Sequence, residues 1–310
     1  MDCIPFPRVL RIELASQCNL ACMHCPTGTI DMTRKIMKEE IFEKILQEVK
    51  IHKNDIKVIV LYHGGEPFLN KNFSRIVTAL KEIDSSFFIK TVSNGMLMTF
   101  DRAKELTECS LDAIEFSLDG ISSEENQFIR RKSDTDTVIL NIMQLIKLKK
   151  EHSFILPHIS ISTTQFFSKN YPLVDYPKAS TPKWLLEIFS NEDVEFKSTY
   201  AMKWPHMGDL NMFDTLEVTD MLETKKECDH IINTITVRAD GSLVPCCFDL
   251  TSQLIMGSIY DKTLDEIWNG DKYRDLRKSI SEKKFTSICN HCLVVKSPVY
   301  LIPKWNEKQI

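Results

Sequence analysis

Three cysteines near the start of the chain have a spacing that suits an iron–sulfur cluster. Cys18, Cys22 and Cys25 lie on one short loop, directly after a β-rich run at Val9–Ala15. Three thiolates can hold three corners of a cubane cluster, which leaves the fourth iron open to a substrate. Catalytic zinc sites keep an open position for the same purpose. Spacing alone also allows a zinc site completed by His24, or thiols that share no site.

Four more cysteines form a second group near the other end of the chain: Cys228, Cys246, Cys289 and Cys292. The pair Asp240-Gly241 between apolar runs predicts a hairpin, which would bring the first two of these thiols to one end. The later Cys-x2-Cys pair can close over them, and four thiolates hold either a complete [4Fe-4S] cluster or a tetrahedral zinc. We treat Cys247 as a spare, because a neighbour in a strand does not easily point into the same site.

The composition excludes several functional classes. The chain has 310 residues and a net charge of −4 without a polybasic run, so nucleic-acid binding is not expected. No apolar stretch reaches the length of a membrane-spanning helix, and Met1–Arg11 does not resemble a signal peptide. We therefore expect a cytoplasmic protein without a membrane partner. Stable disulfides are rare in that compartment, so ten cysteines indicate metal ligands or redox centres. Cys109 fits the apolar core face of a helix, and Cys3 has no assigned role.

Strand and helix patterns alternate through the first two-thirds of the chain. Six β-rich runs are expected, at Val9–Ala15, Ile56–Tyr62, Phe87–Val92, Ala113–Leu118, His158–Thr163 and Val194–Thr199. Apolar residues at helical spacing lie between most of them, for example around Ile41–Val49, Phe73–Leu80, Val138–Ile146 and Trp184–Phe189. This alternation predicts an α/β fold with a parallel sheet and outer helices. Six strands are too few for a closed eight-stranded barrel, so we expect a partial (β/α)6 barrel with ligands at the C-terminal strand ends.

The alternation stops near residue 200, and the segment 200–223 is expected to be a long connection. Thr263-Leu-Asp-Glu266 predicts a capping box at the start of a helix. We therefore divide the chain into a barrel at 8–205, a linker at 206–227 and a small cysteine-rich domain at 228–300, which would owe its order to metal.

The first cysteine group resembles the radical S-adenosylmethionine (SAM) motif, Cys-x3-Cys-x2-Cys, with the aromatic His24 before the last cysteine. The resemblance implies a [4Fe-4S] cluster whose open iron binds and cleaves SAM. It also implies that His24 lies near the adenine. Further short motifs follow the next three strands in the order that the family has them, and together they cover about residues 8–200.

Each of these motifs implies a contact to SAM. Gly64-Gly65-Glu66-Pro67 resembles the segment that binds the methionyl amine, and a carboxylate there suits an ammonium group. Ser93-Asn94-Gly95 is similar to the turn that contacts the ribose. Ser117-Leu-Asp119-Gly follows the fourth strand, and Arg130 lies where the family has an arginine near the SAM carboxylate.

The second cysteine group resembles the auxiliary-cluster extensions called SPASM and twitch domains. A full SPASM domain has further cysteines after the Cys-x2-Cys pair, and none follows Cys292 here. We therefore expect a shortened, twitch-like form with a second [4Fe-4S] auxiliary cluster. The whole layout resembles the butirosin-pathway aminocyclitol dehydrogenase type. Four protein ligands leave no open iron, so this cluster would conduct electrons.

The resemblance implies an enzyme in which SAM yields a 5′-deoxyadenosyl radical that abstracts hydrogen from a small-molecule substrate. We expect an oxidoreductase that oxidises a secondary alcohol of a sugar or aminocyclitol, with the auxiliary cluster as electron acceptor and a flavodoxin or ferredoxin as electron donor. The alternatives are a maturase of ribosomally made peptides, a dehydratase or epimerase, and a non-enzymatic metal scaffold. No catalytic acid or base stands out. The stretch Lys203–Met207 lies where a substrate would enter, but we favour the simpler interpretation that it is a packed linker.

Overall fold

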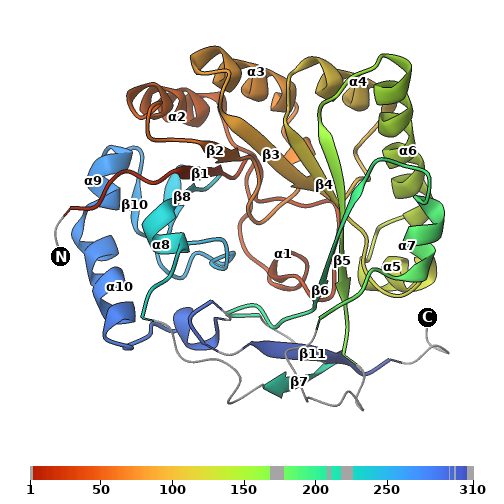
Figure 1. The fold of residues 1–310 in the computed structure, drawn as a ribbon. Coiled ribbons are helices and arrows are strands. Elements are labelled where there is room, and N and C mark those ends of the chain that lie inside the picture. Colours follow the sequence, from red (N-terminus) through yellow and green to blue (C-terminus); the bar gives the residue numbers. More distant parts are fainter. Residues whose placement is uncertain are drawn as a thin grey trace.

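A computed structural model describes residues 3–167, 178–207, 211–217, 226–292, 294–296 and 298–305. Its main feature is a sheet of nine strands (Figure 1). Six neighbouring strands in it are parallel: β1 (Val9–Ile12), β2 (Val58–Val60), β3 (Phe88–Ser93), β4 (Ala113–Ser117), β5 (His158–Gln165) and β6 (Glu195–Tyr200). The predicted partial barrel of six parallel strands is confirmed.

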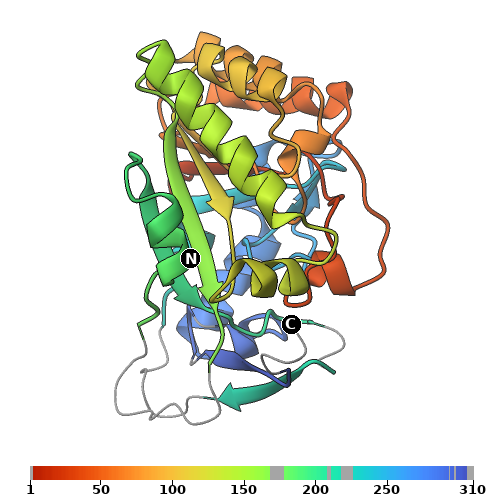
Figure 2. The same ribbon diagram turned by 90° about the vertical axis from the view of Figure 1, so that its right-hand side faces the viewer.

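Helices cover the outer side of these strands (Figures 1 and 2): α2 (Glu39–Ile51), α3 (Phe73–Ile83), α4 (Phe100–Glu108), α5 (Ser123–Ile129), α6 (Thr135–Glu151) and α7 (Lys183–Ile188). The buried residues of α2 recur at helical spacing, as Ile41, Phe42, Ile45 and Val49 do, and they join one large core. The face predicted for α7 forms only in part, because Ile188 is 37% exposed. This helix precedes β6, one of the two edge strands of the sheet. An edge strand offers less surface against which a helix can bury its side chains.

The C-terminal part extends the same sheet. β8 (Thr234–Val237) pairs in parallel with β1, β9 (Ser242–Val244) returns antiparallel to β8, and β10 (Gly257–Ser258) forms the outer edge. The predicted hairpin is therefore present, and Gly241 in its turn has φ +84°, which favours glycine. The division into 8–205, 206–227 and 228–300 stays a prediction, since the hairpin of the last unit shares a sheet with the first.

Short helices complete the C-terminal part: α8 (His230–Asn233), α9 (Leu264–Trp268), α10 (Asp271–Ser281) and η2 (Cys289–His291). The predicted capping box is present at the start of α9, between Thr263 and Glu266. The buried indole of Trp268 donates a hydrogen bond to the Pro5 carbonyl oxygen at 2.9 Å. This bond fastens the N-terminal segment to the C-terminal helices.

The segment 200–223, expected to be a connection, contains the strand β7 (Phe213–Glu217). It pairs antiparallel with β11 (Val299–Pro303), and the two form a separate small sheet (Figure 1). The sequence did not indicate β7, because its partner strand lies more than 80 residues later in the chain. The side chains of β7 are also mostly exposed. Residues 208–210 and 218–223 of this segment lie outside the described residues.

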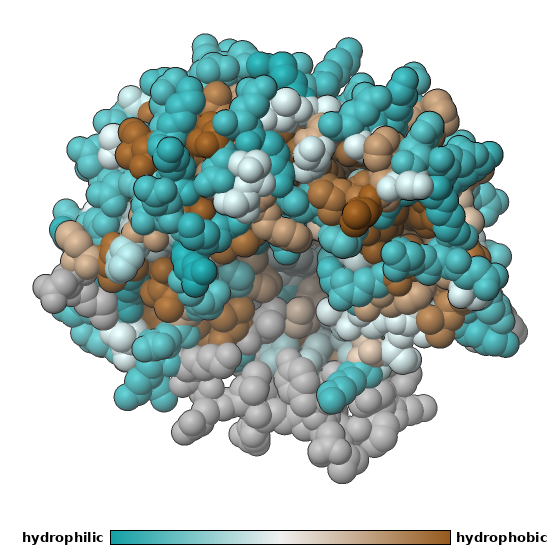
Figure 3. All heavy atoms as spheres, turned by 45° about the horizontal axis from the view of Figure 1, so that its top comes forward, coloured by the Kyte–Doolittle hydropathy of each residue, from teal (hydrophilic) through white to brown (hydrophobic). Residues whose placement is uncertain are grey.

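Figure 3 shows one face of the molecule, where hydrophilic side chains predominate and the surface is hollowed near the middle. Among the described residues, no helix has both the length and the apolar character needed to cross a bilayer.

Candidate active site

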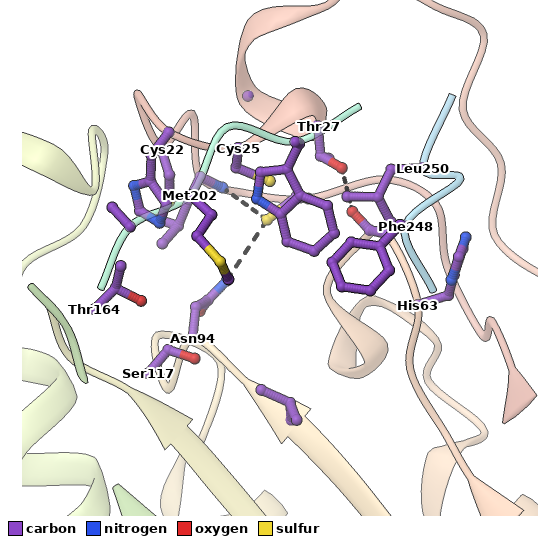
Figure 4. Close-up of a pocket in the computed structure, with 18 of the residues that line it drawn as sticks. Cys22, Cys25, Thr27, His63, Asn94, Ser117, Thr164, Met202, Phe248 and Leu250 are labelled. Carbon is purple, nitrogen blue, oxygen red and sulfur yellow. Dashed lines mark hydrogen bonds between the residues drawn. The ribbon is translucent and has the colours of Figure 1, made fainter. Parts of the chain in front are cut away.

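A cavity of about 310 Å³ lies at the C-terminal ends of the barrel strands. This position is where parallel α/β folds bind their ligands, and the size suits a cofactor or small substrate. Its walls come from parts of the chain that are far apart in the sequence, among them the loop after β1 and the segments around Trp204, Phe248 and Val299. Figure 4 shows Cys22, Cys25, Met202 and Phe248 around this space.

Cys18, Cys22 and Cys25 all line this cavity, on the loop that leads from β1 into α1 (Pro26–Thr29). Burial raises the pKa of the Cys18 thiol to about 11 and that of Cys22 to about 12, so both thiols need a cation nearby to ionise. The Cys18 sulfur accepts hydrogen bonds from the backbone N–H of Leu20 at 3.4 Å and the amide of Asn94 at 3.8 Å. Such donors stabilise a metal-bound thiolate, so this donor set fits an iron–sulfur cluster.

Two glycines allow the loops around the cavity to pack closely. A Cβ on Gly65 would lie 2.3 Å from the carbonyl oxygens of Ala15 and Gln17, which precede Cys18. A Cβ on Gly28 would lie 2.6 Å from the backbone N and O of Cys22. The resemblance assigns Gly64 and Gly65 to the segment that binds the methionyl amine of SAM; the structure shows Gly65 in contact with the start of the cysteine loop. The role of Gly28 was missed.

The structure brings Glu66 together with Ser93 and Asn94, and all three line the cavity. Glu66 caps the short helix η1 (Pro67–Leu69): its Oε1 accepts hydrogen bonds from the Phe68 N–H at 3.2 Å and from the Ser93 hydroxyl at 2.9 Å. Its Oε2 accepts one from the Asn94 N–H at 2.9 Å. Burial raises the pKa of Glu66 to about 7, although these hydrogen bonds oppose the rise. Glu66 is therefore a carboxyl group that ionises readily once a cation approaches.

Asp119, Arg130 and His24 form a buried network beside the cysteine loop. Arg130 Nε lies 2.8 Å from Asp119 Oδ2, and His24 Nε2 lies 3.5 Å from the same oxygen. Burial opposes the charge of Arg130, but Asp119 outweighs it and raises the pKa of Arg130. Burial lowers the pKa of His24, so the imidazole is neutral at neutral pH. Arg130, His24 and Ser117 line the cavity, whereas Asp119 does not line it and is the charged partner of Arg130 and His24.

The second group of thiols also converges. Cys228, Cys246, Cys289 and Cys292 line one small apolar cavity beneath the β8–β9 hairpin. Burial raises the pKa of the Cys246 thiol, and it raises the pKa of Cys292 to about 12. Cys247 does not line this cavity; its sulfur lies 3.8 Å from His230 Nε2. Cys292 and Phe248 line both cavities, so the two groups of cysteines border neighbouring cavities that share part of their lining.

Glu13 makes contacts beside the site that the sequence did not predict. This fully buried side chain accepts a hydrogen bond from the Gly64 N–H at 3.1 Å through Oε1. Through Oε2 it accepts two more, from Arg238 Nε and the Ala239 N–H, both at 3.1 Å. It thus joins the Gly64 loop to the C-terminal hairpin. A charged residue within the apolar run around β1 was the available signal.

Comparisons with known families agree with this arrangement. The radical SAM superfamily model matches residues 12–161, and the SPASM iron-sulfur cluster-binding domain matches residues 228–293. A tungsten-containing aldehyde ferredoxin oxidoreductase cofactor-modifying protein of Pyrococcus furiosus is 24% identical over an alignment of 317 positions, which covers 92% of this chain and 87% of the relative. A probable GTP 3',8-cyclase of Archaeoglobus fulgidus is 31% identical over 263 residues, covering 76% of this chain and 84% of the relative.

Solved structures share the fold. BtrN in complex with AdoMet and 2-DOIA has a TM-score of 0.59 at 15% identity, with 93% of this chain and 94% of that chain covered. Native anSMEcpe with bound AdoMet has a TM-score of 0.60 at 17% identity, covering 93% and 91% of the two chains. The family brings a [4Fe-4S] cluster and SAM as cofactors, and the SPASM domain brings additional iron–sulfur binding. The matched domains, the relatives and the fold together show that this chain belongs to the radical SAM superfamily, with a C-terminal SPASM-type iron–sulfur domain.

Proposed function

We propose that this chain is a radical SAM oxidoreductase that oxidises a secondary alcohol of a small ring substrate, a sugar or an aminocyclitol, and uses the auxiliary site as electron acceptor. One observation carries the proposal: Cys292 and Phe248 border both the cavity of the Cys18 loop and the cavity of the second cysteine group. A substrate in the first cavity would therefore lie next to the auxiliary site.

The residues of the barrel would divide the work of holding the cofactors. Cys18, Cys22 and Cys25 would ligate one cluster, and the bound cluster and SAM supply a 5′-deoxyadenosyl radical for hydrogen abstraction. Glu66 would accept hydrogen bonds from the SAM amine, since a buried carboxyl group gains most from a cationic donor. Arg130, held in place by Asp119, would face the SAM carboxylate.

Other residues predicted to contact SAM also line the cavity. Ser93 and Asn94 would bind the ribose, next to Glu66. Neutral His24 would lie against the adenine, and Ser117 borders the same space. Gly64 and Gly65 would keep the backbone of this loop close to both the cofactor and the cysteine loop.

The oxidation would be completed by electron transfer from the substrate to the auxiliary site. An alcohol carbon that has lost a hydrogen atom becomes a ketone when one more electron and the hydroxyl proton leave. Cys228, Cys246, Cys289 and Cys292 would ligate a cluster fully, so that no iron is open to the substrate, which suits electron transfer. A flavodoxin or ferredoxin would supply the electron that starts each turnover.

The test is anaerobic incubation of the reconstituted protein with SAM, a reductant and candidate sugars and cyclitols, followed by mass spectrometry. We expect a product lighter by two hydrogen atoms. Cys289→Ala should lose this product while it still cleaves SAM, and Cys247→Ala, the matched control outside the second cavity, should retain both activities. Loss of water from the substrate would instead indicate a dehydratase. Modification of a peptide encoded beside the gene would indicate a maturase.

A further inference from the structure

The wall of the cavity that faces the cysteine loop is aromatic and apolar. The rings of Trp204 and Phe248 lie with their centroids 5.4 Å apart and inclined by 46°. Met202 and Leu250 line the cavity beside them (Figure 4). Both rings are half-buried, and each packs against a core cluster and also lines the cavity. Apolar ring faces of this kind hold the apolar side of a ligand.

The segment that carries Trp204 is fixed to the small sheet. The Lys203 N–H donates a hydrogen bond to the Val299 carbonyl oxygen at 2.7 Å, and Met202 forms a β-bridge with Tyr300. The Met207 N–H closes a turn onto the Trp204 carbonyl oxygen at 3.1 Å, and the Met207 side chain is buried in a second core cluster. The segment 203–207 is thus packed through both Met207 and Trp204, and Trp204 also lines the cavity. The ring is held in position before any substrate arrives.

Among the described side chains around the cavity, few carboxylates could pair with a cationic substrate. Within the described part of the chain, Glu66 is the only carboxylate that lines it. Both oxygens of Glu66 already accept hydrogen bonds from the protein, and the proposed function assigns this group to the SAM amine. Arg130 and Lys203 are cationic lining residues, and Arg130 is already paired with Asp119. An ammonium group on the substrate would therefore lose water without gaining a carboxylate partner, which is costly.

From these observations we infer that the substrate is a cyclic polyol without an ammonium group, uncharged or acidic, whose apolar C–H face stacks on Trp204 beside Phe248. The inference rests on the proposed function and narrows it: a sugar or sugar acid fits the site, and an aminocyclitol does not. Trp204 is then the residue that determines ring binding, and the absence of a second carboxylate from the described lining determines the preferred charge.

The test is a binding titration of the SAM-loaded, cluster-reconstituted protein with three ring-shaped probes: myo-inositol, D-glucuronate and D-glucosamine. We expect myo-inositol or D-glucuronate to bind at least about tenfold more tightly than D-glucosamine. Trp204→Ala should weaken that binding by about tenfold or more, and Trp204→Phe should restore most of it, because a smaller ring still stacks. Phe100→Ala, which removes an exposed ring on α4, should bind as the wild type does.

Three results would overturn the inference: D-glucosamine binding as tightly as the other probes, none of the probes binding, or Trp204→Ala binding as well as wild type. Product analysis on the same samples separates this inference from the proposed function. Oxidation of D-glucosamine would refute the charge preference but leave the oxidoreductase proposal intact. Binding of myo-inositol or D-glucuronate to the Trp204 wall without oxidation would support the inferred substrate preference but refute the oxidoreductase proposal.

Discussion

At the scale of single residues, Glu66 shows how burial prepares a side chain for a ligand. The carboxyl group is 2% exposed and receives three hydrogen bonds from uncharged donors, but it has no cation in direct contact among the described residues. Burial therefore raises its pKa to about 7. A bound ammonium group would stabilise the ionised form, so ligand binding and loss of the proton are coupled.

The affinity for SAM is predicted to depend on this ionisation. Below pH 7 the carboxyl group is protonated and must lose its proton before it accepts hydrogen bonds from an ammonium group. The affinity should therefore fall as the pH decreases from 8 to 6, by up to about tenfold per pH unit below the pKa. Glu66→Gln should bind SAM more weakly at pH 8, by about 1.5–3 kcal/mol, and should lack this pH dependence. Equilibrium dialysis of SAM across the pH range measures both effects, and an identical pH profile in Glu66→Gln would refute the role of Glu66.

At the scale of elements, the barrel positions its site through contacts between loops that follow different strands. The loop after β2 carries Gly65 and touches the loop after β1, where the Glu66 N–H donates a hydrogen bond to the Gln17 carbonyl oxygen at 2.8 Å. The hydroxyl of Thr27, in α1, donates to the Gly64 carbonyl oxygen. The cysteine loop and the Gly64–Pro67 loop therefore form one packed unit.

Gly65→Ala should damage the cysteine loop. The new Cβ would lie 2.3 Å from two backbone carbonyl oxygens, a distance that requires the backbone to move. We expect this variant to lose most of the iron of the first site and to bind SAM poorly, as iron analysis and dialysis would show. Gly64→Ala is the matched control, because its Cβ would meet side-chain atoms at 3.0 Å or more, and its effect should be smaller. Normal iron content in Gly65→Ala would contradict this account of the loop contact.

At the scale of the whole molecule, the sequence predicted what depends on local pattern. Alternating strand and helix signals gave the six parallel strands, and Asp240-Gly241 gave the hairpin. The pairing of β8 with β1 and of β7 with β11 joins segments far apart in the chain, and no local periodicity reveals it. The same limit applies to the site. The motif residues could be chosen in advance, and Lys203–Met207 could be named only as a stretch where a substrate would enter. Glu13 and Phe248 acquire their roles only through tertiary contacts.

The two cysteine groups predict the metal content of the whole chain. Anaerobically reconstituted protein should contain about eight irons and about as many sulfides, because each group would hold one cubane. Metal analysis by mass spectrometry checks this count. About four irons with one stoichiometric zinc would assign the second group, Cys228 to Cys292, to a structural zinc site and would remove the proposed electron acceptor.

The most direct test of the central claim is the rate of 5′-deoxyadenosine formation from SAM, measured with reductant under anaerobic conditions in the wild type and in Cys22→Ala. Cys22 lies in the wall of the main cavity on the predicted cluster loop, and its loss would leave that loop with two thiols, Cys18 and Cys25. The wild type should form 5′-deoxyadenosine and methionine, and Cys22→Ala should form neither above background. Formation at the wild-type rate by Cys22→Ala would contradict the claim that this loop holds the SAM-cleaving cluster.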